Sequence, residues 1–252
     1  MNYKKEKDKE LLVLIKEIFF NNYEKYGYLR VTQELKNQGY NVNKKKVQRL
    51  MKENNLLAKP KKRSYHSYRG IVGDIAPNII DRDFIAFRPY EKAGTDVTVF
   101  ITQYGKLYLS PILDMFDSSI IAYDISTTPD FEQIKRMLSK AFSENTNLDG
   151  LIFHSDQGWQ YQMKQYKQML QEKQIKQSFS RKGNCMDNSL MENFFGIIKN
   201  EMFYGHEEEF ETINDLRLAI ENYIKWYNED RINVKRKGLS PLQYRQQSFL
   251  NL

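Results

Sequence analysis

One stretch decides the fold of this 252-residue chain: Phe153-His154-Ser155-Asp156-Gln157-Gly158-Trp159-Gln160-Tyr161. Two apolar residues, Leu151 and Ile152, lead into it, so Asp156 is expected just past the carboxyl end of a short buried strand. In open α/β sheets the ligand-binding crevice lies outside that end of the strands. The sequence therefore predicts an α/β fold with a functional site at Asp156.

Two further acidic residues belong to the same candidate site. Glu192 follows Asp156 with 35 residues between them, and Asp96 lies upstream in a strand-like run at residues 95–101. Carboxylate oxygens are the ligands that Mg²⁺ prefers. Carboxylates from two strands and a helix can hold two divalent cations, which activate both oxygens of an in-line phosphoryl displacement. Asp96, Asp156 and Glu192 are thus the candidate catalytic and metal-binding residues.

The segments around these acids define the expected fold of residues 92–205. Runs at 96–101, 107–114 and 118–125 predict an antiparallel meander of three strands, followed by a helix at 130–143. A strand at 151–154, entered through a helix, is expected parallel to the first. A helix at 163–172, a strand at 176–178 and the helix that carries Glu192 complete a ribonuclease-H-like layout with a mixed five-stranded sheet. Helices at 212–228 and 242–246 and a basic tail form a C-terminal extension, residues 206–252.

The first 57 residues predict a small all-α module. Apolar residues repeat at helical spacing in 8–22, a short helix is expected at 31–36, and Asn43 is a good N-cap for a third helix. Three helices with short joints are typical of a helix-turn-helix. The third helix opens with four basic residues that are expected to bind DNA phosphates: Lys44, Lys45, Lys46 and Arg49. A plain three-helix bundle with charged faces is the alternative.

The positive charge is concentrated at the N-terminal end. The net charge is +7, and residues 1–70 carry 18 Lys or Arg against 7 Asp or Glu. Residues 58–91 are expected to form a basic linker and docking segment, in which Lys61, Lys62 and Arg63 track nucleic acid. This distribution predicts a polyanion-binding arm on a mildly acidic body. A solvated, lysine-rich surface is the alternative.

Several classes of protein are excluded by the composition. No uncharged run of 18 or more residues offers a membrane span, and the charged N-terminus lacks the apolar core of a signal peptide. The single cysteine, Cys185, excludes an internal disulfide and a multi-cysteine zinc site. We expect a cytoplasmic, nucleoid-associated protein without a membrane partner.

Three motifs resemble a known family. They are Asp96 in Gly-Thr-Asp-Val-Thr, Asp156 in His-Ser-Asp-Gln-Gly-Trp-Gln-Tyr, and Glu192 in Gly-Asn-Cys-Met-Asp-Asn-Ser-Leu-Met-Glu-Asn-Phe-Phe. Together they resemble the DDE catalytic core of bacterial insertion-sequence transposases, in particular the second-reading-frame product of the insertion-sequence-three family, one-fifty subgroup. This core is similar to that of retroviral integrases. The resemblance covers nearly the whole chain, including a helix-turn-helix segment at 26–56 and a C-terminal signature at 227–241.

The resemblance implies a function and its partners. Asp96, Asp156 and Glu192 bind two Mg²⁺ ions, for which Mn²⁺ can substitute. The enzyme cuts DNA at the element's end to free a 3′-OH, and this hydroxyl attacks another phosphodiester, which gives DNA transposition, integration and recombination. The implied partners are the terminal repeats, the target DNA, further copies of the chain in a homo-multimer, and the upstream-frame product of the same element.

Other residues have weaker assignments. Lys199 lies seven residues after Glu192, so it is either a DNA-phosphate contact or an ordinary surface lysine. His154 is interpreted as a packing or supporting residue beside the site, with orientation of water or DNA as the alternative. Asp187 is expected to cap the helix of Glu192. Trp159 and Tyr161 are expected to pack in the core, with stacking on DNA as the alternative.

Two other functions remain open from the sequence. A simple ribonuclease-H-like nuclease would hydrolyse DNA without joining it. A DNA-binding regulator would use the N-terminal module and keep a catalytically silent core. Metal-dependent cleavage distinguishes both enzymes from the regulator, and joining distinguishes the transposase from the nuclease.

Overall fold

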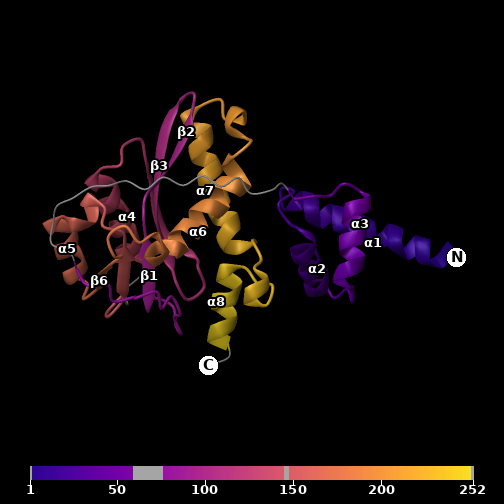
Figure 1. The fold of residues 1–252 in the computed structure, drawn as a ribbon, viewed down its shortest axis with the longest axis horizontal. Coiled ribbons are helices and arrows are strands. Elements are labelled where there is room, and N and C mark those ends of the chain that lie inside the picture. The colour runs from indigo at the N-terminus through magenta and orange to yellow at the C-terminus, as the bar shows by residue number, and fades with distance from the viewer. Residues whose placement is uncertain (1, 59–75, 145–147, 251–252) are drawn as a thin grey trace. The chain divides into compact units, whose positions relative to one another are not determined.

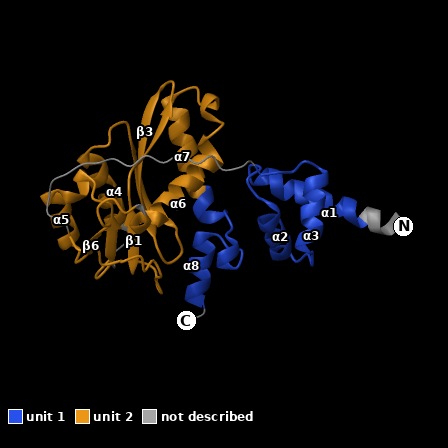
Figure 2. Ribbon diagram, viewed as in Figure 1, with its two compact units in different colours: residues 1–62, 226–252 blue, residues 63–225 orange. Residues whose placement is uncertain are grey.

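The computed structural model describes residues 2–58, 76–144 and 148–250 (Figure 1). The chain forms two compact units (Figure 2): residues 1–62 together with 226–252, and residues 63–225. The predicted boundaries after residues 57, 91 and 205 divide the chain differently, and they stay predictions. None of the described helices combines the length and the apolar character that crossing a membrane requires.

The first unit begins with three helices: α1 (Asn2–Asn21), α2 (Tyr28–Asn37) and α3 (Lys44–Glu53). The predicted cap at Asn43 is confirmed, because its side chain accepts a hydrogen bond from the backbone N–H of Lys45 at 2.9 Å. One buried apolar cluster joins the helices through Ile15, Leu35 and Leu50. The short joints and shared core confirm a helix-turn-helix-like module.

The C-terminal segment packs into this module. It comprises a 3₁₀ turn (Val234–Arg236) and α8 (Pro241–Leu250). Ile232 joins the buried cluster of the three helices, and its backbone N–H donates to the hydroxyl of Tyr26 at 2.9 Å. Asn37 Nδ2 donates to the carbonyl oxygen of Gly238 at 2.8 Å. Residues from the two ends of the chain therefore share one core, which the sequence pattern did not predict.

Gly238 provides a test of this packing. Its φ of +77° favours glycine, and a Cβ there would clash with the side chain of Gln33 on α2. Gly39 has a similar φ of +88°, but a Cβ there would meet nothing within 4 Å. We expect Gly39→Ala to cost about 1 kcal/mol of unfolding free energy and Gly238→Ala somewhat more, because the Gln33 side chain must also shift and lose its hydrogen bond to Asn37. Urea denaturation measures both; equal losses would mean that Gln33 makes room for the added methyl group at no cost.

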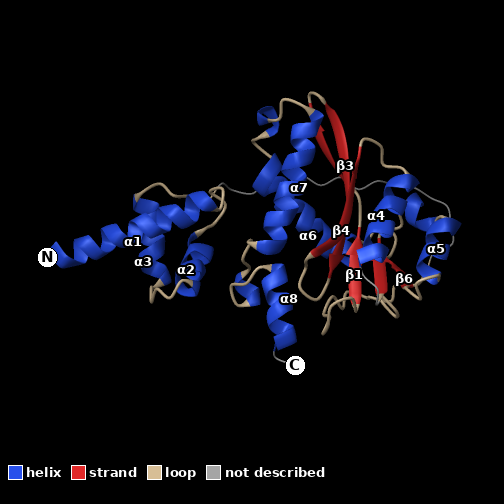
Figure 3. Ribbon diagram, turned by 180° about the vertical axis from the view of Figure 1, so that it is seen from behind, coloured by secondary structure: helices blue, strands red, loops and turns tan. Residues whose placement is uncertain are grey.

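The second unit is built on a mixed sheet (Figure 3). Its strands are β1 (Lys92–Thr95), β2 (Thr98–Thr102), β3 (Gly105–Asp114), β4 (Ile120–Ser126), β5 (Ile152–Ser155) and β6 (Lys176–Phe179). β3 pairs antiparallel with β4 at one edge and with β1 and β2 at the other. β5 pairs parallel with both β1 and β6. The predicted meander and the predicted parallel pair are confirmed, and the fold is ribonuclease-H-like.

The predicted first strand is split in two. β1 and β2 pair with β3 in one continuous register, in which Asp96 and Val97 fall opposite Pro111 and Ser110. Proline has no N–H to donate to a neighbouring strand, so the ladder is interrupted there. Thr95 Oγ1 instead donates to the carbonyl oxygen of Pro111 at 2.9 Å. The sheet therefore has six strands in place of the five expected, because β1 and β2 together occupy the position of the predicted first strand. Asp96 lies at the break between them.

Helices cover both faces of this sheet (Figure 3). The helices of the second unit are α4 (Phe131–Glu144), α5 (Lys164–Gln171), α6 (Ser189–Ile198) and the greater part of α7 (Ile213–Glu229). On one face, Ala93 of β1 belongs to a buried cluster with Leu138 of α4 and Tyr166 of α5. The next residue, Gly94, faces the opposite way, and a Cβ there would lie 3.5 Å from Met191 of α6. The sheet thus separates α4 and α5 from the helix that carries Glu192.

Candidate active site

Asp96 is held at the strand break by two hydrogen bonds. Its Oδ1 accepts the backbone N–H of Val97 at 2.7 Å, and its Oδ2 accepts the side-chain amide of Asn188 at 2.9 Å. The carboxylate is partly buried. Because the ladder is interrupted by Pro111, Asp96 is released from strand pairing beside the carboxyl end of β1. The sequence predicted Asp96 inside a strand, and the structure places it directly after one.

Asp156 follows β5, as the sequence predicted. Its Oδ1 accepts the backbone N–H of Gly158 at 2.8 Å, which fixes the carboxylate in a tight turn. A Cβ on Gly158 would stand 2.9 Å from this oxygen, so glycine is needed there for the close approach. Since β1 and β5 are parallel neighbours, Asp96 and Asp156 both follow the carboxyl ends of adjacent strands.

The charges of the three candidate acids act on one another. The pKa of Asp96 is raised well above its ordinary value, first by burial, then by the negative charge of Asp156, with a smaller contribution from Glu192. Burial also raises the pKa of Asp156, against the hydrogen bond from Gly158. The fold therefore brings Asp96, Asp156 and Glu192 into one electrostatic cluster.

The start of α6 contributes more to the site than Glu192 alone. Asn188, which is 6% exposed, lies one helical turn before Glu192 and bonds Asp96. The sequence analysis did not select it, although its place four residues before Glu192, directly before the first residue of that helix, was a usable signal.

The expected helix cap at Asp187 is wrong. No side chain caps α6, and the buried Asp187 carboxylate accepts hydrogen bonds from Asn78, Arg82 and Arg181 instead. The bonds from Arg181, followed by that from Arg82, hold its pKa well below the ordinary range. Asp187 is thus a structural anchor, and its carboxylate is fully engaged.

His154 is buried next to this anchor. Its Nε2 lies 3.0 Å from the carbonyl oxygen of Asp187, and its Nδ1 lies 2.9 Å from Oγ of Ser178 on β6. A carbonyl accepts only, so Nε2 carries the proton, and burial lowers the pKa of the imidazole. The ring links β5, β6 and the loop before α6, which agrees with a packing and supporting role.

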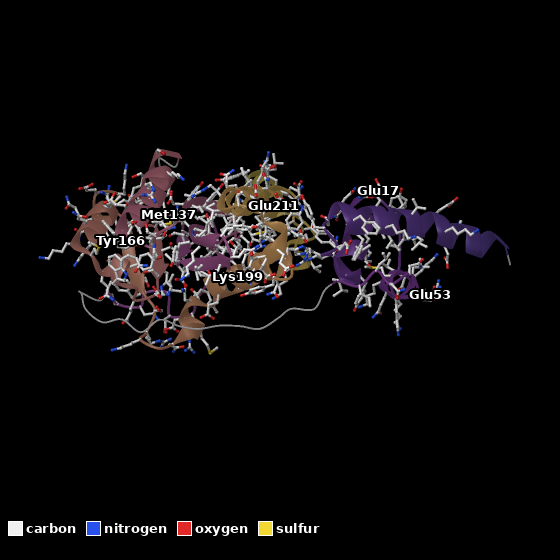
Figure 4. All side chains as sticks on the ribbon, turned by 90° about the horizontal axis from the view of Figure 1, so that it is seen from above. Glu17, Glu53, Met137, Tyr166, Lys199 and Glu211 are labelled. Carbon is white, nitrogen blue, oxygen red and sulfur yellow. The ribbon has the colours of Figure 1, made fainter. Side chains whose placement is uncertain are left out.

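Lys199, labelled in Figure 4, follows the last residue of α6. Its Nζ lies 5.5 Å from the ring centroid of Phe100, and the side chain is partly buried. Burial lowers the pKa of Lys199, while the charge of Asp96 acts in the opposite direction. The ammonium group is therefore near enough to the acidic cluster to interact with it.

The other predicted DNA contacts differ in their surroundings. Lys44 and Lys45 are exposed at the start of α3. Lys46 and Arg49 each lie 2.6 Å from a carboxylate oxygen of Asp8 on α1, so they form ion pairs within the module. Lys61, Lys62 and Arg63 lie outside the described residues. Of the two aromatic residues expected in the core, Tyr161 is buried, whereas Trp159 is 46% exposed, so the expectation is wrong for Trp159.

The donor set fits a hard divalent cation. Among the described residues, no three His, Cys, Asp or Glu side chains form a ready-made ligand cluster. The negative charges of Asp156 and Glu192 nevertheless lie near enough to Asp96 to raise its pKa, so they oppose its ionisation. A bound divalent cation would reverse that effect, since opposite charge favours the ionised form. All the candidate ligands are carboxylates, which suits Mg²⁺ or Mn²⁺.

The raised pKa of Asp156 predicts how stability depends on pH. As pH rises from the ordinary carboxyl value through the raised one, the folded protein keeps its proton longer than the unfolded chain, so the free energy of unfolding falls. Asp156→Asn removes this loss of unfolding free energy. It keeps a side-chain oxygen that accepts the hydrogen bond from the backbone N–H of Gly158. Without metal, the variant is expected to melt above wild type at about pH 7, with the difference shrinking towards about pH 4.

Scanning calorimetry of the metal-free protein at both pH values measures the difference. Asp149→Asn, at an exposed acid in the same unit, is the control and should leave the melting temperature unchanged. If Asp156→Asn has a lower melting temperature than wild type at neutral pH, the Asp156 charge does not destabilise the folded protein.

Comparison with known families agrees with this geometry. Integrase core domain families match residues 86–185 and 192–249, and an HTH-like domain family matches residues 6–64. In fold, the chain is similar to the HTLV-2 integrase catalytic core domain in complex with magnesium. The TM-score is 0.51 and the sequence identity 18%, covering 63% of this chain and 98% of that one. It is also similar to a chain of the simian T-cell lymphotropic virus intasome, with a TM-score of 0.54 and 14% identity over 92% of this chain and 73% of that one.

Relatives in bacteria are more similar in sequence. InsK of Escherichia coli K12, named as a transposase for insertion sequence element IS150, is 48% identical over 94% of this chain and 83% of its own length. Transposase InsF for insertion sequence IS3A, from the same organism, is 32% identical over 90% of this chain and 78% of its own length. The chain therefore belongs to the insertion-sequence transposases of the IS150 and IS3 type, enzymes that transfer DNA strands with an integrase-type catalytic core.

Proposed function

We propose that Asp96, Asp156 and Glu192 are the catalytic carboxylates of this transposase and hold two Mg²⁺ ions, with Mn²⁺ able to replace them. The observation that carries the proposal is that Asp96 and Asp156 follow the carboxyl ends of two adjacent parallel strands, while Asn188, at the start of the helix of Glu192, bonds Asp96. The integrase core domain implies a dependence on divalent metal. Bound divalent cations supply activation of the attacking oxygen and stabilisation of the leaving oxygen in phosphoryl transfer.

The residues of the chain then act mainly by positioning. In the first step a water oxygen bonds to phosphorus at the element's end, the P–O3′ bond breaks, and the leaving oxygen takes a proton to become a 3′-OH. In the second step that hydroxyl attacks a target phosphodiester, and the target's own 3′ oxygen leaves. Each step exchanges one P–O bond for another, so no covalent protein intermediate is needed. Asp96 and Asp156, held by Val97 and Gly158, keep their orientation through both steps.

DNA binding is proposed at several places. The HTH-like domain implies that the chain binds DNA. Lys44 and Lys45, exposed at the start of α3, are proposed to contact phosphates of the terminal repeats, because lysine recognises phosphate charge more than base identity. Lys199 is proposed to contact a phosphate beside the acidic cluster. Trp159, exposed three residues after Asp156, offers a ring on which a base can stack.

The working assembly is proposed to be a homo-multimer that pairs two element ends on target DNA. The intasome neighbour is consistent with this, and the upstream-frame product of the element is proposed as a further partner. We place the protein in the cytoplasm, at the nucleoid, where its DNA substrates are.

The test is a strand-transfer assay with the full chain. A labelled duplex carrying the end of the encoding element is incubated with Mg²⁺ or Mn²⁺ and with wild type, Glu192→Gln or Glu211→Gln, the last at an exposed acid labelled in Figure 4. We expect nicks with a 3′-OH and joined products from wild type and Glu211→Gln, and neither from Glu192→Gln. Hydrolysis without joining would indicate a nuclease. Binding without cleavage would indicate a regulator with a silent core.

A further inference from the structure

We propose that Asn188 is a positioning residue that fixes the Asp96 carboxylate for metal binding. Asn188 is itself held in place by the preceding residue, the buried Asp187. This inference rests on the proposed function of Asp96 as a metal ligand. It adds a residue that takes no part in the acidic triad and carries no charge of its own.

The two hydrogen bonds of Asp96 define its orientation. Val97 N–H donates to Oδ1 and Asn188 Nδ2 donates to Oδ2, so each carboxylate oxygen is held by one donor. A carboxylate oxygen has more than one lone-pair site, so each oxygen can still face a cation. The Val97 bond is local and comes from the neighbouring residue. The bond from Asn188 therefore fixes the plane of the Asp96 carboxylate relative to the rest of the fold.

The position of Asn188 is set by the residue before it. The Asp187 carboxylate is fully enclosed and accepts Arg82 Nε at 2.8 Å, Arg181 Nε at 2.8 Å and Asn78 Nδ2 at 3.1 Å. Its backbone carbonyl accepts from His154. The residue is thus fixed through both its side chain and its main chain, which leaves Asn188 little freedom. Proteins usually orient a metal-binding carboxylate through hydrogen bonds from residues that do not themselves bind the metal.

The chemistry of an amide suits this role. The site already gathers three acids, and a lysine or arginine at residue 188 would compete with the cation for Asp96. An aspartate there would add a fourth negative charge and lose the donor. Asparagine donates to Asp96 without changing the net charge, and its place one turn before Glu192 lets one helix start present both residues.

The experiment measures metal binding apart from turnover. Mn²⁺ binding to the DNA-free full chain is followed by electron paramagnetic resonance for wild type, Asn188→Ala, Asn188→Leu and Asn184→Ala. Asn184 lies in the same loop, and its side chain caps no helix, so it controls for losing an amide there. We expect Mn²⁺ affinity to fall about 10- to 100-fold in both Asn188 variants and to stay unchanged in Asn184→Ala. The metal concentration needed for half-maximal nicking should shift equally, with most of the maximal rate restored at high metal.

Folding and function are separated by two further readings. The melting temperature without metal identifies a variant that does not fold. If Asn188→Ala does not fold, Asn188→Leu, which keeps the branched shape of the side chain and adds no charge, then carries the test. Asp96→Asn, assayed in parallel, tests the proposed function itself. If Asp96→Asn is inactive while both Asn188 variants bind Mn²⁺ like wild type, the positioning role is wrong and the proposed function stands. If Asp96→Asn still joins DNA, the proposed function fails, and this inference fails with it.

Discussion

Asp96→Asn is expected to reduce both cleavage and joining of element-end DNA by at least about a thousandfold in Mg²⁺. A metal ion that stabilises charge in a phosphoryl-transfer transition state contributes several kcal/mol, and each 1.4 kcal/mol is a factor of ten in rate. Asparagine keeps the size of the side chain but replaces one anionic oxygen with an amide nitrogen that cannot bind a cation. The loss should appear in the nicking step and in the joining of a pre-nicked substrate, because both steps use the same site.

DNA binding by the same variant separates chemistry from folding. Lys44 and Lys45 lie in the other compact unit, so the affinity of Asp96→Asn for the element end, measured by gel shift without metal, should equal that of wild type. Asp149→Asn is the matched exposed control and should keep full activity. Joining by Asp96→Asn at more than a tenth of the wild-type rate would remove Asp96 from the catalytic set.

Asp187→Ala is expected to lower the free energy of unfolding of the catalytic unit by about 3 kcal/mol, because removing one partner of a buried ion pair is strongly destabilising. The carboxylate is wholly buried and accepts bonds from Arg82, Arg181 and Asn78. The two arginine side chains are 42% and 49% exposed, so water can solvate them in the variant, which keeps the loss at the lower end of the usual range.

The pH dependence of this loss has a definite sign. The pKa of Asp187 is depressed in the folded state, so its contribution is present above the ordinary carboxyl pKa and is lost as pH falls towards the depressed value. Urea denaturation should therefore show a gap between wild type and Asp187→Ala that narrows in acid. Asp81→Asn removes the charge of an exposed partner of Arg181 and keeps a residue that tolerates the positive φ of 42° there, so it is expected to cost less than about 0.5 kcal/mol. Equal losses in the two variants would contradict the anchoring role.

The order of elements in the catalytic unit could be predicted because its signals are local. Alternation, helical spacing and turn residues predicted the meander, the parallel strand after it and the helix of Glu192. The break at Asp96 was missed, although its signal was visible: Pro111 lies in the middle of the predicted second strand, where a neighbouring strand must lose a hydrogen bond.

The supporting residues could not be predicted in the same way. Asp187 was expected to cap a helix because it directly precedes one, yet its partners Asn78 and Arg82 are more than 100 residues away in sequence. Lys46 and Arg49 were predicted as DNA contacts from their place on the third helix, and the pairing with Asp8 depends on how α1 packs. Contacts of this kind follow from the tertiary fold, which single-residue patterns do not contain.

The shared core of the two chain ends affects the order of events during synthesis. The helices of the N-terminal module leave the ribosome before the catalytic unit. Ile232 and the bonds to Tyr26 and Asn37 become available only after the catalytic unit has been made. A nascent chain halted within the catalytic unit would carry the three helices without their C-terminal partner. Completion of the DNA-binding module is thereby coupled to synthesis of the catalytic unit that lies between its two parts.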